Sequence, residues 1–179
     1  MLGYSSGASL AQAAAKIAPE HGLDVQRSVF AEPPNVATRS LFELMKQFMR
    51  SGAQLDSYID QADSRPLNEA TRLARDDIGY MAGLARPSNV AIAHALGLPT
   101  YGGLVKELVE QQPGLGITTV VASESKISGF AAFQSIEGAG GAALSRQTGV
   151  MILEGAHHAA ADDIDLHAAM MLQGLTLAE

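Results

Sequence analysis

The chain begins MLGYSSGASLAQAAAKIA (residues 1–18), and within this stretch GYSSG (residues 3–7) forms a G-x-S-x-G pattern. Small residues on either side of the serine allow a sharp turn from a strand into a helix, which leaves the serine hydroxyl exposed. The alanine-rich run that follows predicts this helix over residues 6–20, because alanine has the highest helix propensity. Ser5 is therefore a candidate nucleophile, and a plain helix N-cap at Ser5 or Ser6 is the alternative interpretation.

Short runs rich in β-branched and aromatic residues predict three strands, at residues 24–31, 117–122 and 150–153. The first run ends at Pro33 and Pro34, which cannot continue a hydrogen-bonded ladder. Helical patterns separate the predicted strands along the chain. Strands that alternate with helices form a parallel sheet, so the sequence predicts the α/β class.

Residues 40–113 have a different pattern, in which apolar residues recur at three- and four-residue spacing between glycines and prolines. This pattern predicts a block of about five helices. Two further helices are predicted over residues 129–147 and 162–173. The expected organisation is an α/β core of residues 1–35 and 114–179 with a helical cap of residues 36–113.

Composition limits the classes of function. With 179 residues, 47% of them hydrophobic and 17% charged, the chain is long and apolar enough to fold around a packed core. A net charge of −7, scattered lysines and arginines and few aromatic residues argue against a nucleic-acid partner. No apolar run approaches the roughly 18 residues that cross a membrane. The absence of cysteine excludes thiolate chemistry and fits the cytoplasm, which we expect, as well as a secreted protein without disulfides.

A histidine late in the chain is placed to deprotonate Ser5. His158 follows a predicted strand and a glycine-containing loop, from which an imidazole can reach a serine at the same edge of the sheet. His157 is the less favoured neighbour. Adjacent histidines rarely bind one metal ion together, and no H-x-x-x-H or E-x-x-H pattern accompanies them. We therefore expect neither a metal nor a cofactor.

A carboxylate would hold this imidazole in the required tautomer. Glu124, directly after the predicted strand 117–122, is the leading candidate, although a salt bridge with Lys126 would give the same sequence pattern. Glu32, at the end of the strand that precedes the two prolines, is the rival candidate. The aspartates of residues 162–165, or no acid at all, complete the alternatives.

An apolar stripe at helical spacing, which begins with Phe42 and Met45, runs over residues 42–49. A helix face buried in the core is one interpretation, and a wall that binds an acyl chain is the other. Under the second interpretation, Phe42 and Met45 contact the substrate, together with Tyr4 next to Ser5.

Several of these features together resemble the C-terminal two-thirds of an α/β-hydrolase with a helical cap. They are the stretch GYSSGASLA (residues 3–11), the order serine, acid, histidine, the helical insertion, and the ending VMILEGAHH (residues 150–158). The resemblance places the nucleophile motif on Gly3, Ser5 and Gly7, the acid on Glu124, and the histidine loop on Gly155 and His158. It also implies that the backbone N–H of Ser6 binds the oxyanion.

The function implied by this resemblance is hydrolysis of an ester or related acyl bond in a small molecule, through an acyl-enzyme on Ser5. The strands that such folds place before the serine, and one of two oxyanion donors, would be missing, so we expect weak activity from this truncated form. The sheet would also have an unpaired edge, which favours a homo-oligomer. The alternative hypothesis is a non-catalytic binding or interaction module that keeps the hydrolase-like sheet.

Overall fold

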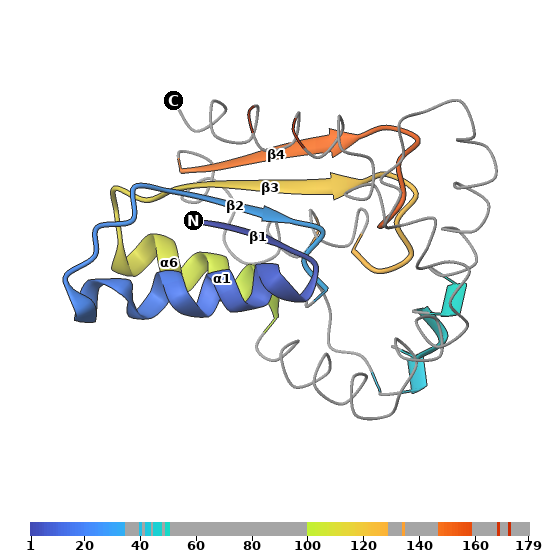
Figure 1. The fold of residues 1–179 in the computed structure, drawn as a ribbon, viewed down its shortest axis with the longest axis horizontal. Helices are drawn as coiled ribbons and strands as arrows, with labels where there is room; N and C mark the ends of the chain where they lie inside the picture. Colours follow the sequence, from blue (N-terminus) through green and yellow to red (C-terminus); the bar gives the residue numbers. More distant parts are fainter. Residues whose placement is uncertain are drawn as a thin grey trace.

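A computed structural model describes residues 1–34, 40, 42–43, 45–47, 49–50, 100–128, 134, 147–158, 168 and 172. Its elements, in chain order, are β1 (Leu2–Tyr4), α1 (Ser6–Ile17), the 3₁₀ turn η1 (Ala18–His21), β2 (Arg27–Ala31), α6 (Tyr101–Gln111), β3 (Gly116–Ala122) and β4 (Thr148–Leu153). The four strands form a sheet, and α1 and α6 pack side by side on one of its faces (Figure 1).

The sheet is parallel throughout, with the order β1-β2-β3-β4. Gly3 pairs with Phe30, and Phe30 pairs with Thr119. Because parallel strands all run in one direction, the residues that follow them gather along a single edge, the carboxyl edge. The predicted parallel sheet is therefore confirmed, and this edge brings together positions that lie far apart in the sequence.

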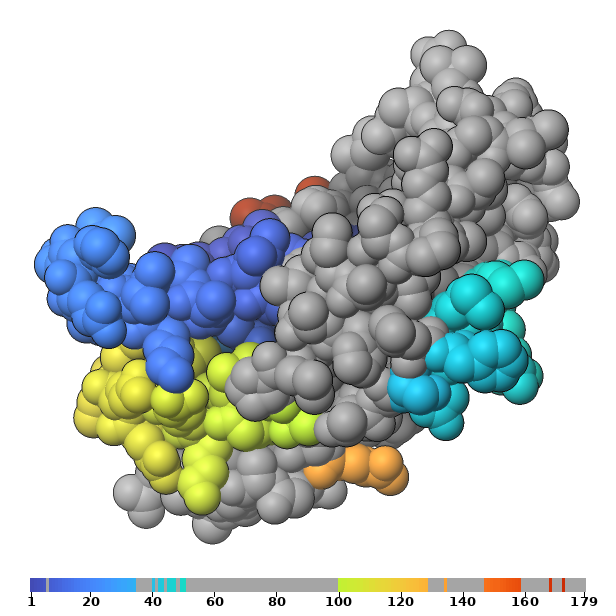
Figure 2. All heavy atoms as spheres, turned by 90° about the horizontal axis from the view of Figure 1, so that it is seen from below, coloured from blue at the N-terminus to red at the C-terminus, as the bar shows by residue number. Residues whose placement is uncertain are grey.

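Alternation along the strands builds a core on each face of the sheet. On one face, α1 and α6 cover Phe30, Ile117 and Val121, and the Phe30 ring meets the Tyr101 ring edge to face at 6.3 Å. Figure 2 shows, from below, the atoms of α1 (blue) next to those of α6 (yellow-green). On the other face is a smaller cluster, which we call the Val29 cluster: Val29, Ala31 and Val120, with Tyr4, Met151 and Leu153 packed against them.

The range predicted as a cap, residues 36–113, ends with α6, and α6 contributes Tyr101, Val105 and Leu108 to the core. This helix therefore belongs with the α/β core. Elsewhere in that range the described positions within residues 42–50 are helical, and residues 51–99 lie outside the described part. The helices expected over residues 129–147 and 162–173 also fall almost wholly outside it. The helices in the described ranges lack the length and hydropathy of a membrane span.

Gly3 allows α1 to begin directly against β1. A Cβ atom at this position would lie 2.3 Å from the carbonyl oxygen of Gly7 and 2.7 Å from Cα of Ala8. Both atoms belong to the backbone of the first turn of α1, so neither can rotate away. Around the Cβ position of Gly7, in contrast, the described part of the chain places no heavy atom within 4 Å apart from the neighbouring residues and backbone of α1 itself. The first glycine of the motif is thus required by packing, and the second is not.

We expect Gly3→Ala to lower the free energy of unfolding by about 2 kcal/mol or more, because the methyl group would push α1 away from β1. The matched variant Gly7→Ala should be neutral or should raise it by up to about 1 kcal/mol, because alanine favours the helix. Urea unfolding followed by circular dichroism measures both changes. Equal unfolding midpoints for the two variants would contradict this account of Gly3.

Candidate active site

Ser5 lies in the turn between β1 and α1, with φ 53° and ψ −125°. L-residues rarely adopt this conformation, which costs about 1–3 kcal/mol and persists only where neighbouring structure holds it. The Ser5 N–H donates to the carbonyl of Ala31 at 2.9 Å, and the Ser5 carbonyl accepts from the Ala8 N–H at 2.9 Å. The turn thus presents Ser5 at the carboxyl edge of the sheet, beside the N-terminus of α1.

His158 reaches Ser5 from the loop that follows β4. Its Nε2 lies 2.9 Å from Ser5 Oγ, although 153 positions separate the two residues. The loop turns at Gly155, which has φ 69°, and the Gly155 N–H donates to Ser123 Oγ at 2.9 Å. His158 is only 8% exposed. The loop after β4 is therefore anchored to the turn after β3, and this anchoring holds the imidazole over the serine.

The carboxylate that contacts His158 is that of Glu32. His158 Nδ1 lies 2.8 Å from Glu32 Oε2, and the Ser128 hydroxyl donates to the same oxygen. The other oxygen, Oε1, accepts from the backbone N–H of Ala122. Glu32 directly follows β2, is fully buried, and has φ 50°. Each carboxylate oxygen therefore has a donor in a site closed to solvent.

Two opposing effects set the pKa of Glu32. Burial, the larger single effect, raises it by disfavouring the charged form. The hydrogen bond and charge of His158, with the hydroxyl groups of Ser125 and Ser128, lower it and together outweigh burial, so the pKa lies below its ordinary value. An ionised Glu32 can accept a hydrogen bond from the Nδ1–H of His158, which leaves Nε2 to accept a hydrogen bond from the Ser5 hydroxyl.

Both ring nitrogens of His158 are thus engaged by residues other than Glu124, the leading acid candidate from the sequence. Glu124 lies in the turn after β3, where its backbone N–H donates to the carbonyl of Ala156 at 2.9 Å. The pKa of the neighbouring His157 lies below its ordinary value. Burial and the charge of His158 lower it, and the negative charges of Glu124 and Glu32 offset only part of this effect. We therefore replace Glu124 with Glu32 as the candidate acid. The aspartates of residues 162–165 lie outside the described part.

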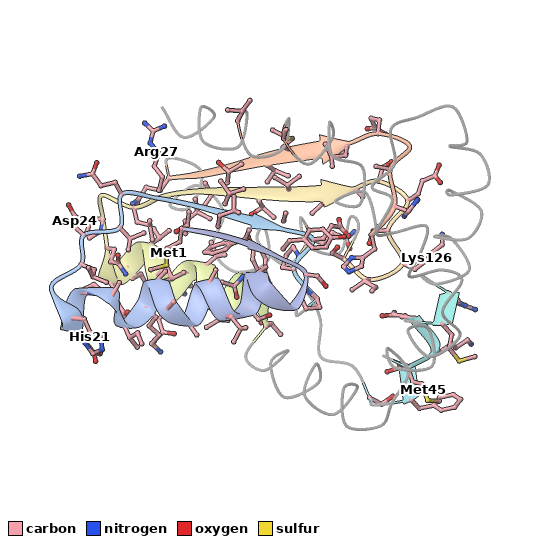
Figure 3. All side chains as sticks on the ribbon, viewed as in Figure 1. Met1, His21, Asp24, Arg27, Met45 and Lys126 are labelled. Carbon is pink, nitrogen blue, oxygen red and sulfur yellow. The ribbon has the colours of Figure 1, made fainter. Side chains whose placement is uncertain are left out.

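The residues predicted to contact substrate occupy different environments. The ring of Tyr4 stacks on that of His158, with the ring centres 5.6 Å apart. Phe42 is 69% exposed, and Met45 is half-buried on the helical segment beyond the carboxyl edge of the sheet (Figure 3). Ser6 is the first residue of α1, so its backbone N–H is among those that have no acceptor within the helix. Substrate contact and oxyanion binding stay predictions for these residues.

Two serines in the loop after β3 were missed from the sequence. Ser125 Oγ accepts from the backbone N–H groups of Ile127 and Ser128, at 3.2 Å each. This local turn directs the Ser128 hydroxyl at Glu32. A serine that lies two or three residues before another polar residue is the sequence pattern that could have indicated the turn. Among the residues that the structure describes, no cluster of three histidine or acidic side chains could hold a metal ion.

Comparison with known proteins gives matches in fold alone. No protein-family model matches the sequence, and no curated protein does. Three solved structures illustrate the likeness, and the chain spans less than two-thirds of each. N-formylmaleamic acid deformylase Nfo from Pseudomonas putida S16 is 18% identical, with a TM-score of 0.56 over 97% of this chain and 64% of its own.

The thioesterase domain from the curacin biosynthetic pathway is also 18% identical, with a TM-score of 0.53 over 96% of this chain and 64% of that domain. A thermophilic esterase from Thermogutta terrifontis is 16% identical, with a TM-score of 0.51 over 96% of this chain and 62% of the esterase. These likenesses confirm the fold class predicted from the sequence.

The lowered pKa of Glu32 predicts how stability depends on pH. A carboxyl whose pKa is lower in the folded state stabilises the fold above its unfolded pKa, and this contribution is lost as the pH falls through the folded value. Glu32→Gln should lower the free energy of unfolding by about 1–3 kcal/mol at pH 7. The difference from wild type should shrink as the pH falls below the ordinary value of 4.5.

Urea unfolding from pH 7 to pH 3 measures this difference, with Glu124→Gln as the matched control because that carboxylate does not occupy either nitrogen of His158. A constant difference between wild type and Glu32→Gln across the range would show that the folded state does not favour an ionised Glu32.

Proposed function

We propose that this chain, whose fold is that of the α/β-hydrolases, carries the catalytic residues of a serine hydrolase acting on an ester or related acyl bond. Two consecutive hydrogen bonds carry the proposal: Ser5 Oγ to His158 Nε2 at 2.9 Å, and His158 Nδ1 to Glu32 Oε2 at 2.8 Å. A hydroxyl, an imidazole and a carboxylate in this order form the arrangement by which a base activates a nucleophile.

In the proposed reaction, Ser5 Oγ attacks the carbonyl carbon of the substrate while its proton passes to His158 Nε2. The carbonyl oxygen becomes an oxyanion, and the backbone N–H of Ser6 donates to it. The carbonyl then re-forms as the bond to the leaving group breaks, His158 gives its proton to the leaving group, and the acyl group stays on Ser5. Water attacks this acyl-enzyme by the same route, releases the acid and restores the serine hydroxyl.

Burial makes Glu32 effective in this reaction. When His158 holds the extra proton, its positive charge lies beside an ionised carboxylate that is closed to solvent, where charges attract more strongly than in water. The donors on Glu32, Ala122 N–H and Ser128 Oγ–H, fix the carboxylate before the reaction begins. Little reorganisation is then needed as charge develops on the imidazole.

The substrate we propose is a small molecule with a carboxylic acyl group, and Phe42 and Met45 are proposed to contact its apolar part. The deformylase, thioesterase and esterase that share this fold are named for different acyl bonds, so we choose an activated ester as the first substrate to test.

Active-site labelling tests the proposal. A fluorophosphonate probe should modify Ser5 and no other residue, as peptide mass mapping can establish, and Ser5→Ala should abolish labelling. Ser9→Ala is the matched control, since Ser9 lies one turn further along α1 and takes no part in the proposed reaction. Failure of Ser5 to react in the wild type, or labelling that survives Ser5→Ala, would refute the proposed nucleophile.

The identity of the acid gives a second test. We expect Glu32→Gln to slow hydrolysis of a p-nitrophenyl ester by about 10³-fold or more, because the imidazole loses the partner that fixes its tautomer. Glu124→Gln should stay within about twofold of wild type. Initial rates of the two variants, measured with protein whose folding is verified by circular dichroism, decide between Glu32 and Glu124. A larger loss of rate in Glu124→Gln than in Glu32→Gln would assign the acid role to Glu124.

A second function, association through an exposed face, is favoured by the outer side of α1. Leu10 is 57% exposed and Ile17 is 47% exposed, and they lie two helical turns apart on the same side of the helix. Beside this helix, β1 is the end strand of the described sheet. Apolar side chains next to an edge strand are typical of an interface between chains.

We propose that two copies of the chain meet through this face. Light scattering should give a mass above that of one chain for the wild type, and Leu10→Glu should return it to that of one chain, because a charge cannot be buried there without a partner. A monomeric wild type at micromolar concentration would exclude this association.

A further inference from the structure

The ring of Tyr4 lies against the imidazole of His158, next to the candidate nucleophile. Its ring centre lies 5.6 Å from that of the imidazole, and the two rings are inclined by 27°, which makes an offset stack. Tyr4 occupies the first variable position of the motif, so the residue before the nucleophile contacts the residue that activates it. The sequence predicted a substrate contact at this position, and the geometry indicates a different role.

The ring of Tyr4 is also packed against the sheet. It packs against the Val29 cluster on the face of the sheet away from α1. Its backbone lies in β1 opposite Ala31, the last residue of β2 before Glu32. The Tyr4 ring is therefore held by the same two strands that carry Ser5 and Glu32, and it offers His158 a rigid aromatic surface.

The Tyr4 ring restrains the orientation of the imidazole in a way that its two hydrogen bonds do not. Glu32 holds Nδ1 and Ser5 holds Nε2, and these two contacts lie at opposite ends of one line across the ring. The bond from Cγ to Cβ also holds the ring, but small rotations about χ1 and χ2 still tilt its plane, and a tilt turns the lone pair of Nε2 away from the serine hydroxyl. A second ring stacked on the imidazole face opposes this rotation.

The strength of the interaction between the two rings also depends on the charge of the imidazole. The face of a tyrosine ring is negative and attracts a cation within about 6 Å of its centre. In the proposed reaction, the imidazole of His158 takes the proton of Ser5 and becomes an imidazolium. Tyr4 would therefore interact more strongly with the transition state than with the resting site, which is the kind of interaction that raises kcat.

We propose that Tyr4 is a positioning residue, which holds the His158 ring in the plane that joins Ser5 to Glu32 and stabilises its protonated form. The catalytic consequence rests on the proposed function. The positioning itself does not, because it concerns the resting arrangement of Tyr4 and His158. Two kinds of measurement therefore separate the proposals, one on the resting protein and one on its reaction.

Proton NMR examines the resting protein. A histidine Nδ1 proton held by a buried carboxylate gives a resonance far downfield, and a ring proton lying over an aromatic face moves upfield. The wild type should show both signals for His158. Tyr4→Leu, which keeps an apolar side chain against the Val29 cluster but offers no ring, should broaden or lose the first signal and return the second to its ordinary position, whereas Tyr4→Phe should keep both.

Steady-state kinetics examine the reaction. Tyr4→Leu should lower kcat for a p-nitrophenyl ester by about threefold to tenfold with KM unchanged, and Tyr4→Phe should recover most of the loss. Met151→Ala is the matched control, because it removes packing from the same cluster on β4 without removing the aromatic ring. It should lower the melting temperature and leave kcat within about twofold of wild type.

The outcomes distinguish the two proposals. If the downfield proton persists in Tyr4→Leu, or if the His158 ring protons of the wild type are unshifted, positioning by Tyr4 is overturned. A raised KM with unchanged kcat overturns it as well and assigns Tyr4 to the substrate. If Ser5 proves unreactive in the wild type, the proposed function fails, and the NMR signals still decide on positioning. Should Tyr4→Leu not fold, Tyr4→Met replaces it, and the wild-type ring-proton shifts test the stack without any variant.

Discussion

The buried carboxylate of Glu32 is the group on which the arrangement at the carboxyl edge depends. A charge closed to solvent destabilises the fold unless donors surround it. Here the donors come from separate parts of the chain: Ala122 at the end of β3, Ser128 in the following loop, and His158 after β4. The need to satisfy one carboxylate therefore draws three segments towards the end of β2. Ser5 joins them through His158.

Strain accompanies this convergence. Among the described residues, Ser5 and Glu32 are the two other than glycine that have a positive φ. Each lies directly after a strand, and each donates its backbone N–H to the neighbouring strand: Ser5 to Ala31 and Glu32 to Val120. The hydrogen bonds of the sheet thus extend one residue beyond β1 and β2, to Ser5 and Glu32, although the backbones of these two residues are not extended. The stability of the ladder offsets the unfavourable backbone at the two positions that carry the proposed chemistry.

The sequence was informative where a short pattern determines the local structure. The G-x-S-x-G motif and the following alanines indicated the turn at Ser5, and the apolar strand before a glycine loop indicated His158. The choice between Glu32 and Glu124 could not be made in this way, because both follow strands at the same edge. The side-chain donors that distinguish them come from distant segments.

Other features also depended on tertiary contacts. β1 has three residues, too few to show an alternating pattern, and its pairing with β2 defines it. Helix α6 has the same periodicity as a helix of a cap, and only its packing on Phe30 places it in the core. The stack of Tyr4 on His158 joins residues 154 positions apart, and no local pattern marks it.

The unequal surroundings of the two glycines in the nucleophile turn bear on how such turns are recognised in other sequences. Gly3 is confined by the backbone of the helix that follows, whereas position 7 has room for a side chain. A search pattern that demands glycine at both places would pass over chains that could build the same turn with alanine or serine at the second. Weighting the first glycine alone, and asking for a helix immediately after the serine, would follow the steric requirement more closely.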